Sequence, residues 1–142
     1  YLTFSEVAAV DFYSQSKKSE GLLMAPAYAV PRLLERADMS LQDFDFYEIH
    51  EAFAAQVLCT LKAWESEDFC KNKLDLNKAL GSIDRSKLNV KGSSVATGHP
   101  FAATGARILA TLAKTLHQNG GGKGLISICA AGGQGVTAIV EA

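Results

Sequence analysis

The sequence Leu-Ile-Ser-Ile-Cys-Ala-Ala-Gly-Gly-Gln-Gly-Val-Thr-Ala-Ile-Val-Glu, residues 125–141, decides the fold. Two apolar segments, 125–130 and 136–141, flank a glycine-rich run over 132–135, which predicts two strands joined by a turn. So short a connection cannot carry the chain across to a parallel neighbour, so we expect an antiparallel hairpin.

Outward from this hairpin, strand and helix patterns alternate along the chain. Residues 101–119 place apolar side chains on one helical face, and glycines 120–122 end the pattern. The other segments that we expect are one strand or two short ones over 1–13, a solvated loop over 15–21, a helix opening at Pro26, a buried strand over 44–49, a helix over 51–64 and an irregular surface segment over 65–91. This alternation predicts one α/β domain over residues 1–142, with a mixed β-sheet covered by helices.

The composition is that of a globular domain. The chain has 142 residues, of which 48% are hydrophobic and 20% charged, and its formal net charge is −1. A balanced charge offers no electrostatic footprint for nucleic acid or an anionic membrane, so we expect neither partner. No apolar run approaches the roughly 20 residues that a membrane-spanning helix needs.

The cysteine content indicates the redox compartment, and the first residue indicates whether the chain is a fragment. Three cysteines without a Cys-x-x-Cys pair argue against a disulfide framework or a zinc ribbon and favour a reducing compartment. The chain starts at Tyr1, inside a strand-like stretch, rather than at Met. We therefore expect it to be a fragment of a longer protein.

His99 is the first candidate for chemistry. Pro100 at the first helical position would make His99 the residue that caps the helix, beside the positive end of the helix dipole. That field disfavours an imidazolium and favours a neutral ring that accepts a proton, because a helix N-terminus lowers the pKa of an adjacent imidazole. The alternative is a capping histidine bonded into the surface, although Gly98 and Gly105 leave room for a ligand.

Cys129 is the second candidate. A cysteine at the end of an apolar strand is by default an inert buried thiol. The strand breaks directly afterwards into the glycine-rich run, whose backbone N–H groups could point at an oxyanion. The functional interpretation of Cys129 depends on that run.

The remaining candidates have plainer interpretations. His50 follows a predicted strand, and we expect a solvated or capping side chain there, with Glu51 as an acid in the first turn of the next helix. A zinc site from His50, His99 and Cys129 is conceivable, but no short ligand spacing supports it. Cys59 and Cys70 would pack in the interior or lie on the surface.

Three separated motifs together resemble one family. Residues 47–54 (Tyr-Glu-Ile-His-Glu-Ala-Phe-Ala), 98–105 (Gly-His-Pro-Phe-Ala-Ala-Thr-Gly) and 129–135 (Cys-Ala-Ala-Gly-Gly-Gln-Gly) occur in the order and spacing of the thiolase C-terminal domain. The stretches 24–31 and 43–45 also resemble the helix and strand that precede the first motif. The resemblance runs over essentially the whole chain, and it implies a five-layer fold of two similar α/β halves, of which this chain is most of the second.

The resemblance implies an acyl transfer in two half-reactions. A cysteine of the N-terminal half attacks the 3-keto carbon; His99 deprotonates it, and Cys129 protonates the departing acetyl-CoA enolate. His50 stands where most relatives have an asparagine of the first oxyanion hole, the backbone N–H of Ala131 belongs to the second, and Phe53 lines the pantetheine channel. With a histidine at this position, the chain resembles the branch of the family found in bacterial fatty-acid oxidation complexes and the mitochondrial trifunctional enzyme.

The resemblance also implies the partners. Coenzyme A is a substrate and no cofactor is needed, and the partners are acyl-CoA thioesters, the N-terminal thiolase half, and either a second copy or a hydratase/dehydrogenase subunit. The location would be the bacterial cytoplasm or the mitochondrial matrix. We expect no turnover by this chain alone, because neither Cys59 nor Cys70 lies in a nucleophile motif, and we expect an exposed apolar face where the other half packs.

Three alternatives remain open. One is a biosynthetic acetoacetyl-CoA thiolase, which this segment does not separate from a degradative one. A decarboxylating condensing enzyme is a second, although that class typically has histidine where this chain has Cys129. A non-catalytic thiolase-like module for dimerisation or docking is the third.

Overall fold

The structure is a computed structural model that describes residues 1–13 and 20–142. Most of the loop expected over 15–21 therefore lies outside the described residues. The elements are β1 (Leu2–Ala9), α1 (Ala25–Ala37), β2 (Phe46–Ile49), α2 (Ala54–Glu65), α3 (Glu67–Lys73), η1 (Arg85–Lys87), α4 (Ser94–Thr97), α5 (Thr104–Asn119), β3 (Lys123–Ala130) and β4 (Gln134–Glu141).

The described strands form one mixed sheet in the order β1-β4-β3-β2. Strands β2 and β3 are parallel, and β4 runs antiparallel to both of its neighbours. The predicted hairpin is confirmed, but Ala130 pairs with Gln134, so the loop is only residues 131–133. Gly132 and Gly133 in this loop have φ of 92° and 74°, which glycine adopts without the strain of a side chain.

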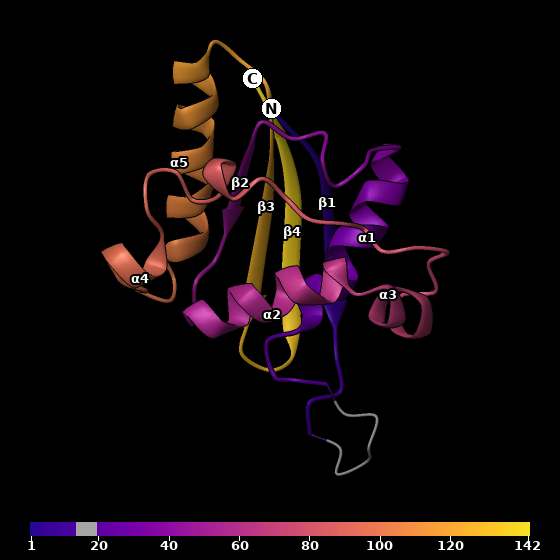
Figure 1. The fold of residues 1–142 in the computed structure, drawn as a ribbon. Helices are drawn as coiled ribbons and strands as arrows, with labels where there is room; N and C mark the ends of the chain where they lie inside the picture. The colour runs from indigo at the N-terminus through magenta and orange to yellow at the C-terminus, as the bar shows by residue number, and fades with distance from the viewer. Residues whose placement is uncertain (14–19) are drawn as a thin grey trace.

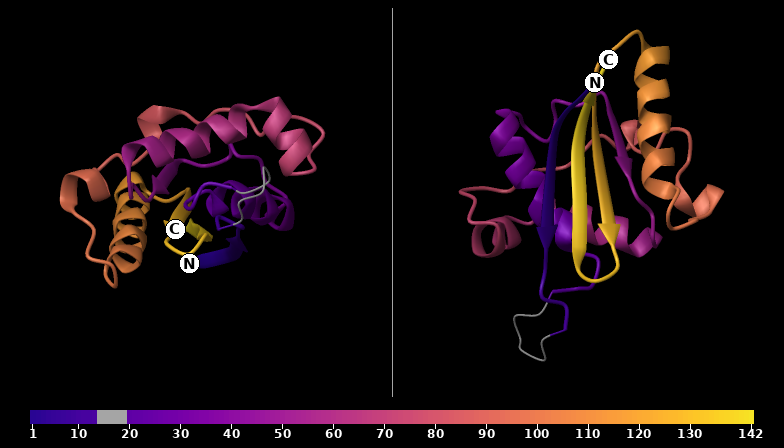
Figure 2. Two further views of the ribbon diagram at one scale, coloured as in Figure 1. Left: turned by 90° about the horizontal axis from the view of Figure 1, so that it is seen from below. Right: turned by 180° about the vertical axis from the view of Figure 1, so that it is seen from behind.

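Helices cover both faces of the sheet, which confirms the α/β class. Helices α1 and α2 pack on one face around Trp64, Tyr47 and Leu125, and α5 packs on the other through Ile108, Leu112 and Leu116 (Figure 1). The left view of Figure 2 shows α5 and the α1–α2 pair on opposite sides of the sheet, and the right view shows β1 and β4 largely uncovered beside α5. The second face is therefore only partly buried within this chain.

A proline is tolerated inside α1 because another residue uses the carbonyl that it leaves free. Pro31 lies in the second turn and has no N–H for the carbonyl of Ala27. The buried indole of Trp64 donates to that carbonyl at 3.4 Å. The helix predicted to open at Pro26 is thus confirmed, and this contact joins it to α2.

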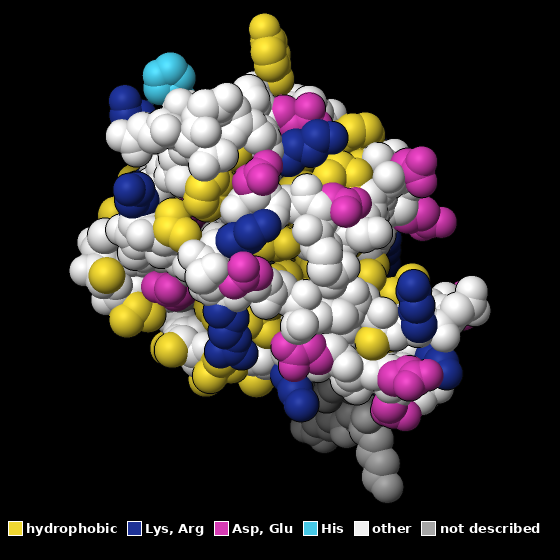
Figure 3. All heavy atoms as spheres, turned by 45° about the horizontal axis from the view of Figure 1, so that its top comes forward, with side chains coloured by type: hydrophobic (Ala, Val, Ile, Leu, Met, Phe, Trp, Pro, Cys, Tyr) yellow, Lys and Arg dark blue, Asp and Glu magenta, His cyan; other side chains and the backbone are white. Residues whose placement is uncertain are grey.

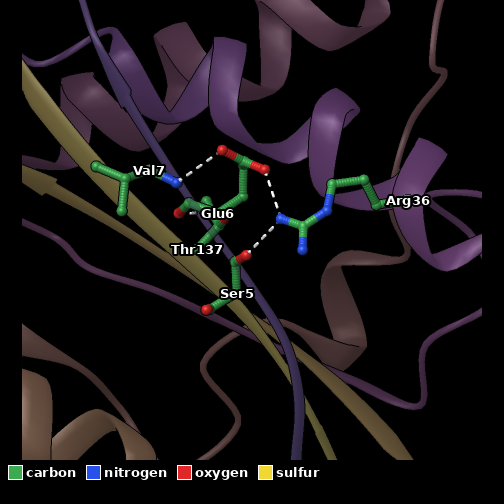
Figure 4. A network of polar contacts seen from close by, with 5 residues as sticks. All are labelled: Ser5, Glu6, Val7, Arg36 and Thr137. Carbon is green, nitrogen blue, oxygen red and sulfur yellow. Dashed lines mark hydrogen bonds and ion pairs between the residues drawn. The ribbon is translucent and has the colours of Figure 1, made fainter.

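The edge strand β1 is fastened to α1 by a polar network (Figure 4). Arg36 donates to the Glu6 carboxylate at 2.8 Å and to the Ser5 carbonyl at 2.9 Å. Glu6 also accepts the N–H of Val7, and Arg36 and this N–H hold the pKa of Glu6 below its usual value. The strand expected over 1–13 ends at Ala9.

Two helices begin later than we predicted. The helix expected over 51–64 begins at Ala54, because Glu51 turns away and accepts the side-chain amide of Asn89 and the backbone N–H of Val95. The prediction of Glu51 as an acid in the first turn of that helix is therefore wrong.

The helix expected over 101–119 begins at Thr104, and Ala103 is its N-cap residue. The Pro100 carbonyl accepts the N–H groups of both Ala103 and Thr104, so residues 100–103 close a turn of their own before the helix. Pro100 is not at the first helical position, and the prediction that His99 caps the helix is wrong.

The segment 65–91 is less irregular than we expected, because it contains α3 and η1. Ser66 caps α3 by accepting the N–H of Phe69, and Glu67 pairs with Lys71 at 2.6 Å. Cys70 in this helix is fully buried, whereas Cys59 is exposed.

Candidate active site

The parallel pairing of β2 and β3 brings two of the candidate residues to one edge of the sheet. Ile49 pairs with Ser127, and the next N–H, that of His50, donates to the Ser127 carbonyl at 2.9 Å. His50 therefore follows β2 beside the end of β3, where Cys129 lies. The carboxyl ends of parallel strands are where α/β sheets commonly bind ligands.

The α4–α5 loop brings His99 to the same edge. The rings of His50 and His99 have centroids 4.3 Å apart, and the Phe101 ring centroid lies 4.9 Å from that of His99. A cavity of about 450 Å³ opens among these loops and is lined mainly by apolar side chains. Its lining includes all five residues singled out in the sequence: His50, Phe53, His99, Cys129 and Ala131.

Hydrogen bonding of Thr104 assigns the tautomer of His99. The Thr104 hydroxyl donates to the Pro100 carbonyl at 3.1 Å and lies 2.7 Å from Nδ1 of His99. A hydroxyl that gives its one hydrogen to this carbonyl accepts from the ring, and this arrangement places the ring proton on Nδ1. The lone pair of His99 is then on Nε2, the nitrogen that can act as a base.

His50 is buried, and the prediction of a solvated or capping side chain is wrong. The residue is 2% exposed, and its Nδ1 lies 2.9 Å from the Ser94 hydroxyl. Burial chiefly, and then His99 and Arg107, lower the pKa of His50 to about 4, although Glu51 acts in the opposite direction. The ring is therefore neutral at physiological pH.

Cys129 is 7% exposed, and burial raises the pKa of its thiol, although backbone N–H groups of Cys129 and Ala52 act in the opposite direction. The group is held as a neutral thiol, able to give a proton. Opposite it on β4 stands Gly135, where a Cβ would lie 2.6 Å from the backbone nitrogen of Pro26. Glycine at this position lets the start of α1 pack close to the thiol.

Ala131 opens the hairpin loop on the exposed side of the cavity. The described non-glycine residues with positive φ are Asp38, Asp75 and Asn89, so the backbone at Ala131 accommodates its side chain. An alanine here keeps the backbone N–H that the predicted oxyanion hole needs. Phe53, the N-cap residue of α2, is 66% exposed at the rim.

Sequence reasoning missed four residues that surround the histidines: Glu48, Ser94, Thr104 and Arg107. Glu48 is 1% exposed on β2, and burial raises its pKa to about 7, against the opposing effect of Arg107. The carboxylate in the middle of an apolar strand at residue 48 was a signal in the sequence. Over residues 1–13 and 20–142, no three His, Cys, Asp or Glu side chains are grouped to hold a metal ion.

The same part of the chain contains no helix long and apolar enough to cross a bilayer. On the face in Figure 3, Lys and Arg side chains lie among Asp and Glu without a continuous patch of one sign. The cavity, which joins the neutral His50 imidazole, the His99 imidazole and the neutral Cys129 thiol, is the site with distinctive chemistry.

The family model described as "Thiolase, C-terminal domain" matches residues 5–142. The chain belongs to the thiolase family. It is 48% identical over 141 residues to the 3-ketoacyl-CoA thiolase of Alteromonas mediterranea, with 99% of this chain and 31% of the relative covered. Over 122 residues it is 52% identical to that of Shewanella woodyi, with 86% of this chain and 28% of the relative covered.

Two solved thiolase-family structures are also similar. The acetyl-CoA acetyltransferase of Bacillus anthracis has a TM-score of 0.71 and 41% identity, over 99% of this chain and 29% of that one. The peroxisomal 3-ketoacyl-CoA thiolase of Saccharomyces cerevisiae, described as five-layered with two core domains of identical topology, has a TM-score of 0.72 and 33% identity, over 97% and 32%. This chain therefore spans less than a third of these thiolases.

Proposed function

We propose that this segment supplies the acid–base half of the active site of a 3-ketoacyl-CoA thiolase. The enzyme would cleave 3-ketoacyl-CoA with coenzyme A to give acetyl-CoA and a shortened acyl-CoA, as in fatty-acid β-oxidation. The observation that carries the proposal is the convergence of His50, His99, Cys129 and Ala131 on one largely apolar cavity.

In the first half-reaction, Nε2 of His99 takes the thiol proton of a nucleophilic cysteine from the N-terminal half. The thiolate attacks the 3-keto carbon, the C2–C3 bond breaks, and its electron pair passes to the enolate of acetyl-CoA. Cys129 donates its proton to C2 of that enolate, which leaves an acyl thioester on the nucleophile.

In the second half-reaction, the Cys129 thiolate takes the thiol proton of incoming coenzyme A. The coenzyme A thiolate attacks the acyl thioester, the shortened acyl-CoA leaves, and the released cysteine thiolate takes its proton back from His99. Hydrogen-bond donors stabilise the oxyanions: His50 and the protonated His99 in one hole, and the N–H of Ala131 in the other. No metal or other cofactor enters these steps.

The exposed apolar side chains support a partner half. Five large ones are Phe53 and Phe101, which line the cavity, Val95 on α4, Leu109 on α5 and Val136 on β4. The five-layered yeast relative, with its two core domains, supports an N-terminal half packed on this surface. A further copy or a hydratase/dehydrogenase subunit would then be an outer partner, in the cytoplasm if the source is bacterial.

The test compares the complete protein with its Cys129→Ala variant, with acetoacetyl-CoA and a long-chain 3-ketoacyl-CoA as substrates. We expect thiolysis by the wild type, a loss of roughly 10²-fold or more in the variant, and no turnover by the 142-residue chain alone. Turnover by the isolated chain, or unchanged turnover in the variant, would contradict the proposal.

The same assay addresses a second candidate. The 41% identity to the Bacillus anthracis acetyl-CoA acetyltransferase supports a thiolase restricted to acetoacetyl-CoA. Such an enzyme would turn over acetoacetyl-CoA and leave the long-chain substrate intact.

A further inference from the structure

A chain of polar contacts links His50 to Ser94 and Arg107, neither of which lines the cavity. The Ser94 hydroxyl is 2.9 Å from Nδ1 of His50, and Nη2 of Arg107 is 3.0 Å from that same hydroxyl. Arg107 also reaches the Ser93 hydroxyl at 3.3 Å. His50 is 2% exposed and Ser94 is 6% exposed, so water does not readily replace these contacts.

The direction of each hydrogen bond follows from counting hydrogens. A guanidinium is only a donor, so the Ser94 oxygen accepts from Arg107. The single hydrogen of Ser94 then needs an acceptor, and the acceptor that the described residues place within reach is Nδ1 of His50. A proton on Nδ1 would leave this buried hydroxyl hydrogen unpaired, an arrangement that folded proteins avoid.

We propose that Arg107 and Ser94 are positioning residues that hold His50 in the tautomer with its proton on Nε2, so that the ring donates a hydrogen bond into the cavity. The donor would meet the oxyanion that forms on the substrate thioester, and this last step rests on the proposed function. Neither Arg107 nor Ser94 needs to touch the substrate.

The surrounding charges support a neutral donor at His50. The Arg107 cation and the neighbouring His99 ring both oppose a positive charge on His50. Glu48, two residues earlier on β2, is buried, and its Oε2 has no hydrogen-bond partner among the described residues. The Arg107 cation acts against the rise in the Glu48 pKa that burial causes, so the two groups interact.

The two histidines then have complementary states. Thr104 holds the proton of His99 on Nδ1 and leaves Nε2 free to accept. The Arg107–Ser94 pair places the proton of His50 on Nε2 instead. Two rings with centroids 4.3 Å apart would thus present one base and one donor to the same cavity.

The decisive measurement is the ¹⁵N spectrum of the complete protein labelled at histidine, with the His50 signals assigned by their loss in His50→Asn. We expect an unprotonated Nδ1 and a protonated Nε2 at neutral pH. A protonated Nδ1 in the wild type would overturn the proposal. The spectrum does not depend on turnover. If the complete protein had no thiolase activity, the proposed function would be contradicted, but the spectrum would still show which nitrogen of His50 carries the proton.

Variants test the positioning role against a merely structural one. We expect Ser94→Ala to lower kcat about 10-fold with little change in KM, less than the roughly 10²-fold loss on removing an oxyanion donor itself. Ser94→Thr, which keeps the hydroxyl, should recover the rate and the wild-type spectrum. Ser93→Ala is the matched control, because Ser93 contacts Arg107 without reaching His50. Equal losses in Ser93→Ala and Ser94→Ala, with an unchanged His50 spectrum in both, would overturn the proposal.

Discussion

The loop after β2 and the loop before α5 each present a histidine to the same cavity, but they hold it in different ways. His50 is buried, and the contacts of Glu51 fasten its loop to Asn89 and to Val95 of α4. His99 is exposed, and its ring is hydrogen-bonded to Thr104, at the first turn of its own helix. The hydroxyl beside each ring, rather than the ring itself, decides which nitrogen carries the proton.

In the proposed mechanism, this difference gives one chain a base and a hydrogen-bond donor from two side chains of the same type. The Thr104 hydroxyl donates to a carbonyl and so must accept from His99, whereas the Ser94 hydroxyl accepts from an arginine and so can donate to His50. Burial adds to the contrast by keeping His50 neutral. The contacts that hold the loop of His50 come from this chain. The exposed loop of His99 is accessible to a partner surface.

The largest expected effect concerns the exposed loop. In the complete protein, His99→Ala removes the proposed base, and general-base catalysis contributes roughly 10²–10⁴-fold. We expect kcat/KM for 3-ketoacyl-CoA thiolysis to fall by about that factor, measured in steady-state assays. A loss of less than about 10-fold would break the assignment of His99 as the base.

The next effect concerns the buried loop. His50→Ala removes an oxyanion donor, a change that costs roughly 10²–10³-fold in kcat, whereas His50→Asn keeps an N–H and should lose only about 10-fold. Steady-state kcat values of the two variants give the comparison. Equal losses in both would show that the imidazole contributes something other than a hydrogen bond.

The third prediction separates two buried groups by pH, Glu48 on β2 and His50 directly after it. The pKa of His50 is lowered from 6.5 to about 4, so the unfolded chain binds the extra proton in that interval and stability falls as the pH drops. The pKa of Glu48 is raised from 4.5 to about 7, so the folded chain binds the extra proton and stability falls as the pH rises. The two slopes oppose each other between about pH 4.5 and 6.5.

Single variants should therefore uncover each slope. Between pH 4.5 and 6.5, we expect the free energy of unfolding of Glu48→Gln to rise with pH and that of His50→Asn to fall, each by about 2 kcal/mol. Urea unfolding of the complete protein at several pH values measures both. Parallel profiles for the two variants would show that the groups are not buried as the structure has them.

The smallest effect concerns the residue that orients His99. Thr104→Val removes the hydroxyl that accepts from Nδ1, and we expect kcat to fall about 10-fold with a smaller change in KM. Thr115→Val is the matched control, because Thr115 is buried in the same helix and donates to the Thr111 carbonyl without contacting a histidine. Similar kcat losses in both variants would assign the effect to helix stability.

Much of the architecture could be predicted because local patterns carry it. The hairpin of β3 and β4, the helix opening at Pro26 and the mixed sheet follow from apolar periodicity and from glycine and proline positions. The errors lie at element starts. Glu51 and the Pro100 carbonyl each make contacts that compete with the helix the pattern predicted.

The candidate site divides in the same way. His99, Cys129, His50, Ala131 and Phe53 were named from their motifs, and the structure places all five on one cavity, while their roles stay predictions. Ser94, Thr104 and Arg107 were not found, because a serine or an arginine on a helix is ordinary until its partner is known. Only Glu48, a carboxylate within an apolar strand, had a signal of its own.

The sequence by itself determined which elements form and which side chains able to move protons stand at their ends, since both depend on the local order of residues. Only the tertiary structure decided that His50 is buried and that His99 precedes the helix rather than caps it. It also decided that two hydroxyls place the proton on different nitrogens of these two rings. The physical reason is that burial and hydrogen-bond direction depend on which groups far apart in the sequence meet, and folding alone brings Arg107, Ser94 and His50 together.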